Sequence, residues 1–187
     1  MRTENDAVGE AGLRFFGKIS ATVSHEIKNG LAVINENAGL LQDLLLMAER
    51  GRPLDPARVK SIALRVLDRV ARADLVVRNL NRFAHQVDDP AAAVDLLETL
   101  TLMVALTGRL TANRGKRVRI VPPEPAVRVT TNPFALLNLC WCCLEAAMEA
   151  APEKPELTVH IQARPGGAEI RIGGIDDLDA FSRTFQG

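Results

Sequence analysis

The sequence contains few aromatic residues: no tyrosine, one tryptophan and six phenylalanines among 187 residues. This scarcity disfavours a surface on which single-stranded nucleic-acid bases stack. The chain also has no excess of either charge, because 23 lysine and arginine residues balance 23 aspartate and glutamate residues. Sequence-independent DNA binding requires a basic surface, since contacts to phosphates supply most of its affinity. We therefore expect no nucleic-acid partner.

The sequence also lacks long hydrophobic runs, and it lacks cysteines distributed along the chain. No apolar stretch reaches the roughly 20 residues that cross a bilayer, and the polar N-terminus does not look like a signal peptide. The three cysteines all lie between positions 140 and 143, which excludes a disulfide framework and is typical of a reducing compartment. An apolar share of 47% excludes a disordered chain. We predict a folded cytoplasmic protein with no membrane partner.

The sequence divides into two regions with different patterns near position 90. Between positions 10 and 84, apolar residues recur at helical spacing on both sides of one break, at 51–56. Within that break, Asp55 and Pro56 predict the N-cap and first position of a second helix. Two antiparallel helices cannot enclose a core alone, so a hairpin from a second copy would complete a four-helix bundle. We predict a homodimerising helical hairpin over residues 1–89.

The second region, residues 90–187, has a mixed pattern that predicts an α+β domain. Residues 85–93 are interpreted as a linker and 94–113 as a helix. Short strands are predicted at 117–121 and 127–130, and Asn132-Pro133 is expected to open a helix that ends near Ala151. A β-hairpin is predicted from 157–163 and 168–172, and a last short helix from 176–185.

The segment from Ser24 to Leu31 is the most informative for chemistry. On a helix, His25 lies away from the apolar face and shares a polar stripe with Lys18, Thr22 and Asn29. An exposed imidazole is partly unprotonated near neutral pH and can attack a phosphoryl group. The neighbouring Glu26 could hold one ring nitrogen, while Lys28 and Asn29 could meet the phosphoryl charge. The alternative is an ordinary solvated surface histidine.

The run His-Glu-Ile-Lys-Asn-Gly-Leu at 25–31 resembles the H-box of bacterial sensor histidine kinases, in their dimerisation and histidine-phosphotransfer domain. The resemblance implies that His25 is the phosphoacceptor and Glu26 its acid/base partner. Asn29 falls where the family often orients water for dephosphorylation. Gly30 departs from the family, which usually has proline there. The implied partners are receiver domains of response regulators.

The second region resembles a reduced form of the family's ATP-binding α/β sandwich. The family binds Mg-ATP through a helix motif Asn-Leu-x-x-Asn-Ala, and this chain has Asn-Leu-Cys-Trp-Cys-Cys at 138–143. Cys142 therefore replaces the asparagine that would hold magnesium. Where the family has Asp-x-Gly-x-Gly after the last strands, this chain has Gly173 and Gly174 without the aspartate. We expect no bound cofactor or metal and no ATP binding, with Mg²⁺ residing in the receiver partner.

Basic residues are concentrated between positions 50 and 82, with nine basic and three acidic residues. Such a run can be a solvated helix face, or it can steer the acidic phosphorylation pocket of a receiver. Under the second interpretation, Arg65, Arg69 and Arg72 belong to the docking surface. The full set of predicted partner-binding residues is Lys18, Thr22, Lys28, Arg65, Arg69 and Arg72.

These features favour a histidine phosphotransfer protein of a bacterial phosphorelay, which carries a phosphoryl group on His25 to or from receiver aspartates. The reaction would be a phosphotransfer without ATP-dependent kinase activity. Two alternatives stay open at this point. One is a divergent kinase that autophosphorylates with ATP, and the other is a pseudokinase that binds or dephosphorylates a response regulator.

Overall fold

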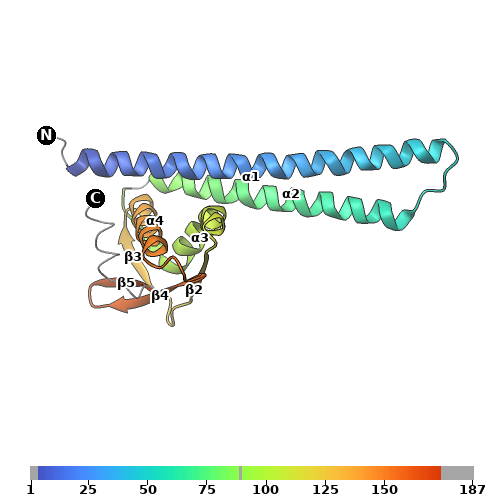
Figure 1. The fold of residues 1–187 in the computed structure, drawn as a ribbon. Helices are drawn as coiled ribbons and strands as arrows, with labels where there is room; N and C mark the ends of the chain where they lie inside the picture. Colours follow the sequence, from blue (N-terminus) through green and yellow to red (C-terminus); the bar gives the residue numbers. More distant parts are fainter. Residues whose placement is uncertain (1–3, 89, 174–187) are drawn as a thin grey trace. The chain divides into compact units, whose positions relative to one another are not determined.

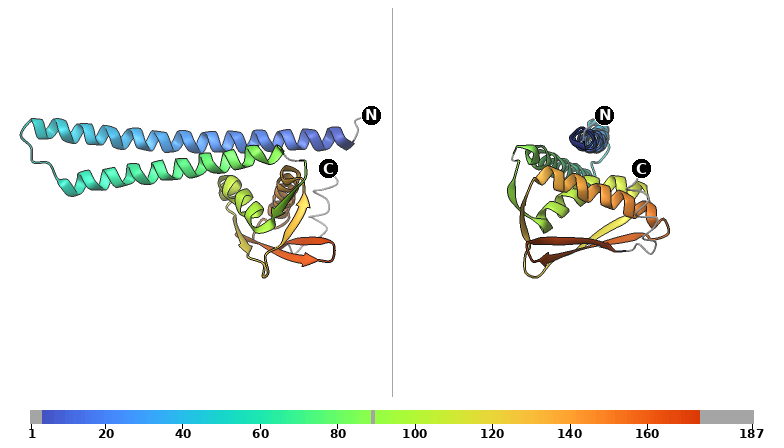
Figure 2. Two further views of the ribbon diagram at one scale, coloured as in Figure 1. Left: turned by 180° about the vertical axis from the view of Figure 1, so that it is seen from behind. Right: turned by 90° about the vertical axis from the view of Figure 1, so that its left-hand side faces the viewer.

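A computed structural model describes residues 4–88 and 90–173 (Figures 1 and 2). The elements are α1 (Glu4–Glu49), α2 (Pro56–Ala84), a 3₁₀ turn η1 (His85–Val87), β1 (Ala92–Asp95), α3 (Leu96–Asn113), β2 (Arg117–Val121), β3 (Arg128–Thr131), α4 (Pro133–Ala150), β4 (Glu156–Arg164) and β5 (Gly167–Gly173). The predicted α+β class is confirmed, and the long first helix is present. The helix predicted at 176–185 lies outside the described residues.

The chain forms two compact units, and both long helices contribute to each of them. Residues 23–80 form one unit, which we call the hairpin unit. The described residues up to Thr22 and from Asn81 onward form the other, which we call the α+β unit. The units thus divide the chain elsewhere than at the 89/90 boundary drawn from the sequence, because the start of α1 and the end of α2 pack with the second region.

The loop between α1 and α2 contains the residues that end the first helix and cap the second. Gly51 has φ of 81° and its N–H donates to Ala48 O at 2.9 Å, which is a common way for a helix to end. At the start of α2, the Asp55 carboxylate accepts the Ala57 N–H at 2.9 Å, which confirms the predicted N-cap.

Much of the apolar surface of the hairpin unit is uncovered. Leu31 on α1 is 56% exposed and Leu67 on α2 is 64% exposed. The exposed large apolar residues are Leu31, Leu40, Leu45, Leu46 and Met47 on α1, and Leu64, Leu67, Val70, Leu75 and Val77 on α2. Single exposed leucines are ordinary, but a set of this size along two helices is typical of an association surface.

The α+β unit contains two small sheets, and its first strand corrects the sequence analysis. β1 pairs antiparallel with β3, while β2, β4 and β5 form a second sheet in which β2 runs parallel to β4. The prediction of a linker over 85–93 is therefore wrong at its end, where Ala92 and Ala93 join β1. Two alanines carry no strand signal of their own, so the pairing with β3 decides the structure. α3 then begins after Asp95, whose carboxylate accepts the Leu97 and Glu98 N–H groups.

Helices α3 and α4 cover one face of the larger sheet (Figure 2). α4 is capped by Asn132, whose Oδ1 accepts the Ala135 N–H at 2.8 Å, and Pro133 is its first residue. In the described part of the chain, α4 is the one helix long and apolar enough to cross a membrane, yet 44% of that stretch is buried within the structure. Its apolar character is explained by its place in the core.

Lys116 fixes the loop that follows α4. This side chain is buried, and its Nζ donates to the backbone oxygens of Ala151, Pro152 and Lys154 at 2.6 Å each. Ala151 is the C-cap of α4 and the other two carbonyls belong to the loop after it, so the buried ammonium satisfies backbone oxygens of this loop with charge-assisted bonds. Lys116 thereby connects the start of β2 to the end of α4.

The aromatic residues of the α+β unit gather where the ends of α1 and α2 meet α4. The Phe83 ring lies 5.5 Å from that of Phe15, 5.4 Å from that of Phe16 and 5.7 Å from that of Phe134. Trp141 stacks on Phe15 at 6.5 Å. The only other aromatic residues of the chain are at positions 181 and 185, outside the described residues. This aromatic cluster makes the helix ends part of the α+β core.

Candidate functional site

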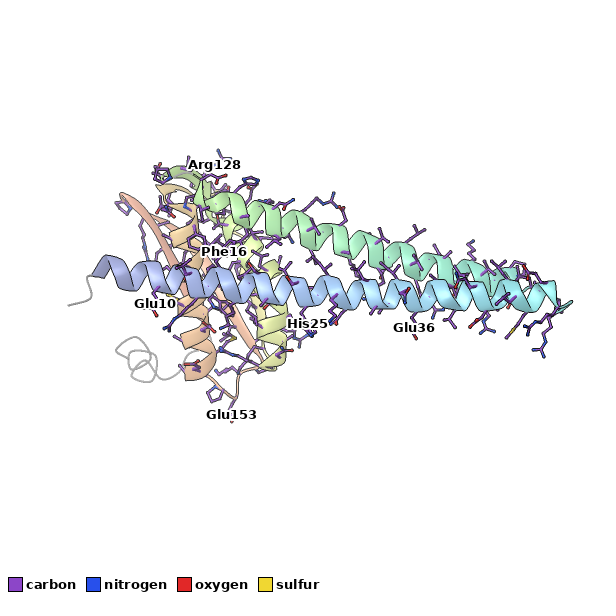
Figure 3. All side chains as sticks on the ribbon, turned by 90° about the horizontal axis from the view of Figure 1, so that it is seen from above. Glu10, Phe16, His25, Glu36, Arg128 and Glu153 are labelled. Atoms are coloured by element: carbon purple, nitrogen blue, oxygen red, sulfur yellow. The ribbon has the colours of Figure 1, made fainter. Side chains whose placement is uncertain are left out.

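His25 is an exposed residue of α1 within the hairpin unit. Figure 3 shows it on the side of α1 that faces away from α2. Its ring makes no hydrogen bond or ion pair with any described residue. The imidazole is therefore accessible from solvent.

Two of the predicted neighbours extend the polar face on which His25 lies. At about 100° per residue, Asn29 is roughly 40° from His25 around the helix and Lys28 roughly 60°, and both side chains are exposed. Glu26 is exposed too, but as the next residue it projects about 100° away and makes no hydrogen bond to the imidazole. The structure thus brings His25, Lys28 and Asn29 onto one face and leaves Glu26 beside it.

Lys18 and Thr22 belong to the α+β unit and are held by contacts within it. The Lys18 ammonium forms an ion pair with the Glu145 carboxylate and lies 5.1 Å from the centroid of the Trp141 ring. Arg114 donates to the same carboxylate at 3.2 Å. The Thr22 hydroxyl donates to Lys18 O at 2.8 Å. We call the contacts among Lys18, Trp141, Glu145 and Arg114 the Lys18 clamp.

The sequence analysis missed Trp141 and Glu145 as partners of Lys18. The available signal was their spacing, because residues four apart on α4 share a face. Nothing in the sequence, however, indicated that this face meets α1. The predicted role of Lys18 in partner binding stays a prediction, but its ammonium is already paired in this structure.

The three arginines of the predicted docking surface are exposed on α2, in the same unit as His25. Counting from the loop at 1.5 Å per residue, Arg72 is no more than about 12 Å from the level of His25 along the helices. Arg69 and then Arg65 lie farther toward the loop. Arg72 donates to Asp68 at 3.0 Å, so part of its charge is neutralised. Arg65 borders a shallow depression with Lys60 and Leu64.

In the region that resembles a nucleotide site, the described residues offer thiols and apolar side chains. Cys142 occupies the position of the missing asparagine, and its thiol lies 3.7 Å from Asn138 Oδ1 on the preceding turn. The neighbouring cavity between α3, α4 and the sheet is lined by apolar and sulfur-containing side chains, with no charged group among its described lining. A triphosphate needs cationic or N–H donors and magnesium needs oxygen ligands. No described group of three or more histidine, cysteine or acidic residues could hold a metal ion.

The cysteines of α4 are poor nucleophiles. Burial, together with the neighbouring Cys143, raises the pKa of Cys140 to about 12. Burial is also the main cause that raises the pKa of Cys142 and of Cys143, with smaller contributions from Glu145 and Cys142 respectively. Since the thiolate is the reactive form, these groups behave near neutral pH as small apolar side chains.

Comparison with known proteins assigns no family to the chain. No protein-family model matches the sequence. No curated protein matches it either. The residues at 25–31 therefore resemble an H-box by their sequence alone.

Proposed function

We propose that the protein is a histidine phosphotransfer protein that accepts a phosphoryl group on His25 from the aspartate of a receiver domain and passes it to another receiver. The observation that carries this proposal is an exposed, unpaired imidazole on a long helix, within the run His-Glu-Ile-Lys-Asn-Gly-Leu. A cytoplasmic location is part of the proposal.

The transfer consists of one displacement at phosphorus. The lone pair of one His25 ring nitrogen forms the new N–P bond while the P–O bond to the receiver aspartate breaks. The electron pair of that bond leaves with the aspartate, which becomes a free carboxylate. The proton on the other ring nitrogen stays there or passes to an acceptor, for which Glu26 is the nearest carboxylate in sequence. In the second step the aspartate carboxylate of the other receiver attacks the phosphorus, the N–P bond breaks, and its electron pair returns to the His25 ring nitrogen.

The chain contributes positioning and charge to this step. Phosphoryl transfer depends mainly on in-line alignment and on stabilising the charge of the transferred group. A helix fixes the backbone from which these side chains project, and Lys28 and Asn29 offer an ammonium and an amide on the face of His25. The magnesium ion belongs to the receiver in this proposal.

The character of the cavity supports a partner, rather than ATP, as the source of the phosphoryl group. The described lining offers neither a charge for a triphosphate nor oxygen ligands for magnesium. A kinase that autophosphorylates with ATP would need both.

A second copy of the chain is the proposed occupant of the apolar surface on the hairpin unit. Leu31 follows His25 by six residues, which separates them by about 120° around α1. A partner hairpin that covers Leu31 would therefore complete a four-helix bundle and leave His25 accessible.

The test uses a panel of receiver domains phosphorylated with radiolabelled acetyl phosphate. We expect label to move onto the full-length chain within minutes, to be lost in acid and to be absent from His25→Ala. His85→Ala is the matched control, because His85 is exposed but pairs with Asp88 at 2.8 Å, and it should accept label normally. Equal labelling of His25→Ala would refute the proposal.

Two further arms separate the alternatives. Incubation with ATP labelled on its γ-phosphate should leave the chain unlabelled, and label on His25 under these conditions would establish autokinase activity instead. Loss of phosphate from a bound receiver without label on His25, even at short times, would establish a pseudokinase or phosphatase role.

A further inference from the structure

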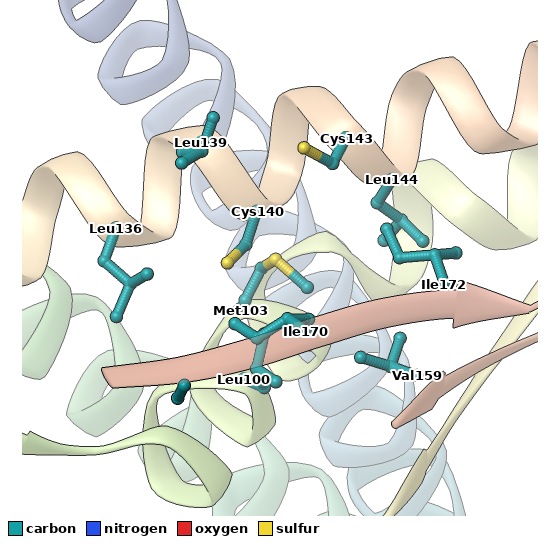
Figure 4. A pocket seen from close by; sticks show the side chains of 11 residues that line it. Leu100, Met103, Leu136, Leu139, Cys140, Cys143, Leu144, Val159, Ile170 and Ile172 are labelled. Carbon is teal, nitrogen blue, oxygen red and sulfur yellow. The ribbon is translucent and has the colours of Figure 1, made fainter. Parts of the chain in front are cut away.

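An apolar cavity of the α+β unit lies between α3, α4 and the larger sheet and is partly open to solvent, since Leu139 in its lining is 57% exposed (Figure 4). Its volume is about 280 Å³. α3, α4 and β5 each line it, and the residues on which the argument depends are Leu100, Met103, Cys140, Cys143, Ile170 and Ile172. Figure 4 shows the side chains of Met103 and Cys140 among those that line the cavity.

The lining determines the chemistry of a ligand. It consists of hydrocarbon, thioether and thiol groups, and burial keeps the Cys140 thiol uncharged near neutral pH. A charged or strongly polar molecule would lose its hydration without gaining partners. An apolar molecule would gain dispersion contacts that the walls otherwise lack, because interiors are normally close-packed. Sulfur atoms are polarisable and make favourable contacts with aromatic rings.

The volume limits the size of the ligand. An engineered apolar cavity of roughly 150 Å³ in another protein stays dry and takes up benzene. A cavity about twice as large has room for a bicyclic ring system or a chain of about ten carbons. We propose that this cavity binds a small uncharged apolar molecule of that size, in place of a nucleotide.

The same helix joins this cavity to the Lys18 clamp. Cys140 and Cys143 line the cavity, whereas Trp141 and Glu145, on another face of α4, hold Lys18. A molecule that contacts Cys140 therefore changes the packing of α4, the helix that positions Trp141. Occupancy should be visible at the Trp141 indole, which does not itself line the cavity.

The experiment titrates the full chain with naphthalene and follows NMR signals of methionine methyl groups and of the single tryptophan indole. We expect a saturable shift of the Met103 methyl and a smaller shift of the Trp141 indole. Met148 is buried but does not line the cavity, so its methyl should stay unchanged. 2-Naphthoate, with the same rings and a negative charge, should bind at least tenfold more weakly.

Two variants separate cavity binding from general adsorption. Ala168→Phe places a ring at a lining position and should abolish the naphthalene response. Gln162→Phe puts the same ring on β4 next to the buried Ile161, so it points to the other face of the sheet and should leave the response intact. Thermal unfolding checks that both variants fold.

Three results would overturn the inference: no saturable shift of Met103, an undiminished response in folded Ala168→Phe, or equal binding of naphthoate. Saturable displacement of naphthalene by Mg-ATP would also overturn it, since the site would then be a nucleotide site. No receiver domain is used, so the outcome is independent of whether His25 transfers phosphoryl groups.

Discussion

Replacing Phe83 with alanine tests whether the end of α2 belongs to the core of the α+β unit. Phe83 is fully buried, and its ring lies within 6 Å of three other phenylalanine rings. Truncation of a buried phenylalanine costs about 3–5 kcal/mol, including the cavity that it leaves. The site has little room to collapse, because Gly12 already approaches the Phe134 ring so closely that a Cβ there would lie 3.1 Å from it. We therefore expect a cost in the upper half of that range.

The matched control is Phe16→Ala. Phe16 stacks on Phe83 at 5.4 Å but is 37% exposed, so its truncation leaves an opening to solvent instead of a buried void. The loss should be limited to about 1–2 kcal/mol, from one aromatic pair and part of a side chain's burial.

Urea unfolding followed by tryptophan fluorescence measures both variants. Trp141 is the only tryptophan, is buried and stacks on Phe15, so its emission reports on the aromatic cluster itself. With an m-value of about 2 kcal/mol/M, a cost of about 4 kcal/mol lowers the midpoint by about 2 M. If Phe83→Ala costs no more than Phe16→Ala at equal protein concentration, the helix ends are not integral to the α+β core.

Two other predictions concern Cys140 and the hairpin surface. Because burial raises the pKa of Cys140 from 9.0 to about 12, the folded state holds this proton more tightly than the unfolded state. The resulting stability is complete below pH 9 and is lost toward pH 12. Between pH 9 and 10.5, the free energy of unfolding of the wild type should therefore fall by up to about 1.4 kcal/mol per pH unit relative to that of Cys140→Val. Parallel pH profiles of the two proteins would contradict this. For the hairpin, Leu31→Glu combined with Leu67→Glu should convert a dimer into a monomer in sedimentation, whereas the exposed Ala32→Glu should not, and an unchanged mass for the double variant would refute the dimer.

Local sequence signals were sufficient for most element boundaries. The N-cap at Asp55, the strand at 117–121 and the start of α4 after Asn132 all depend on residues within a few positions of one another. β1 was missed because its alanines gain strand structure only from pairing with β3, more than thirty residues later. A segment of four residues is too short for such pairing to be recognised from alternation of apolar and polar residues.

Long-range packing also decides what the candidate site can use. In the sequence, Lys18 and Lys28 look alike, since both are basic residues on the polar side of one helix. In the structure, Lys18 is paired with Glu145, 127 positions away, and lies over the Trp141 ring, while Lys28 is exposed. An ammonium already paired with a carboxylate has less charge to offer a phosphoryl group, and it must break that pair first. Of the two lysines, Lys28 is therefore the one available to assist the transfer that we propose at His25, and Lys18 serves to anchor α1 against α4.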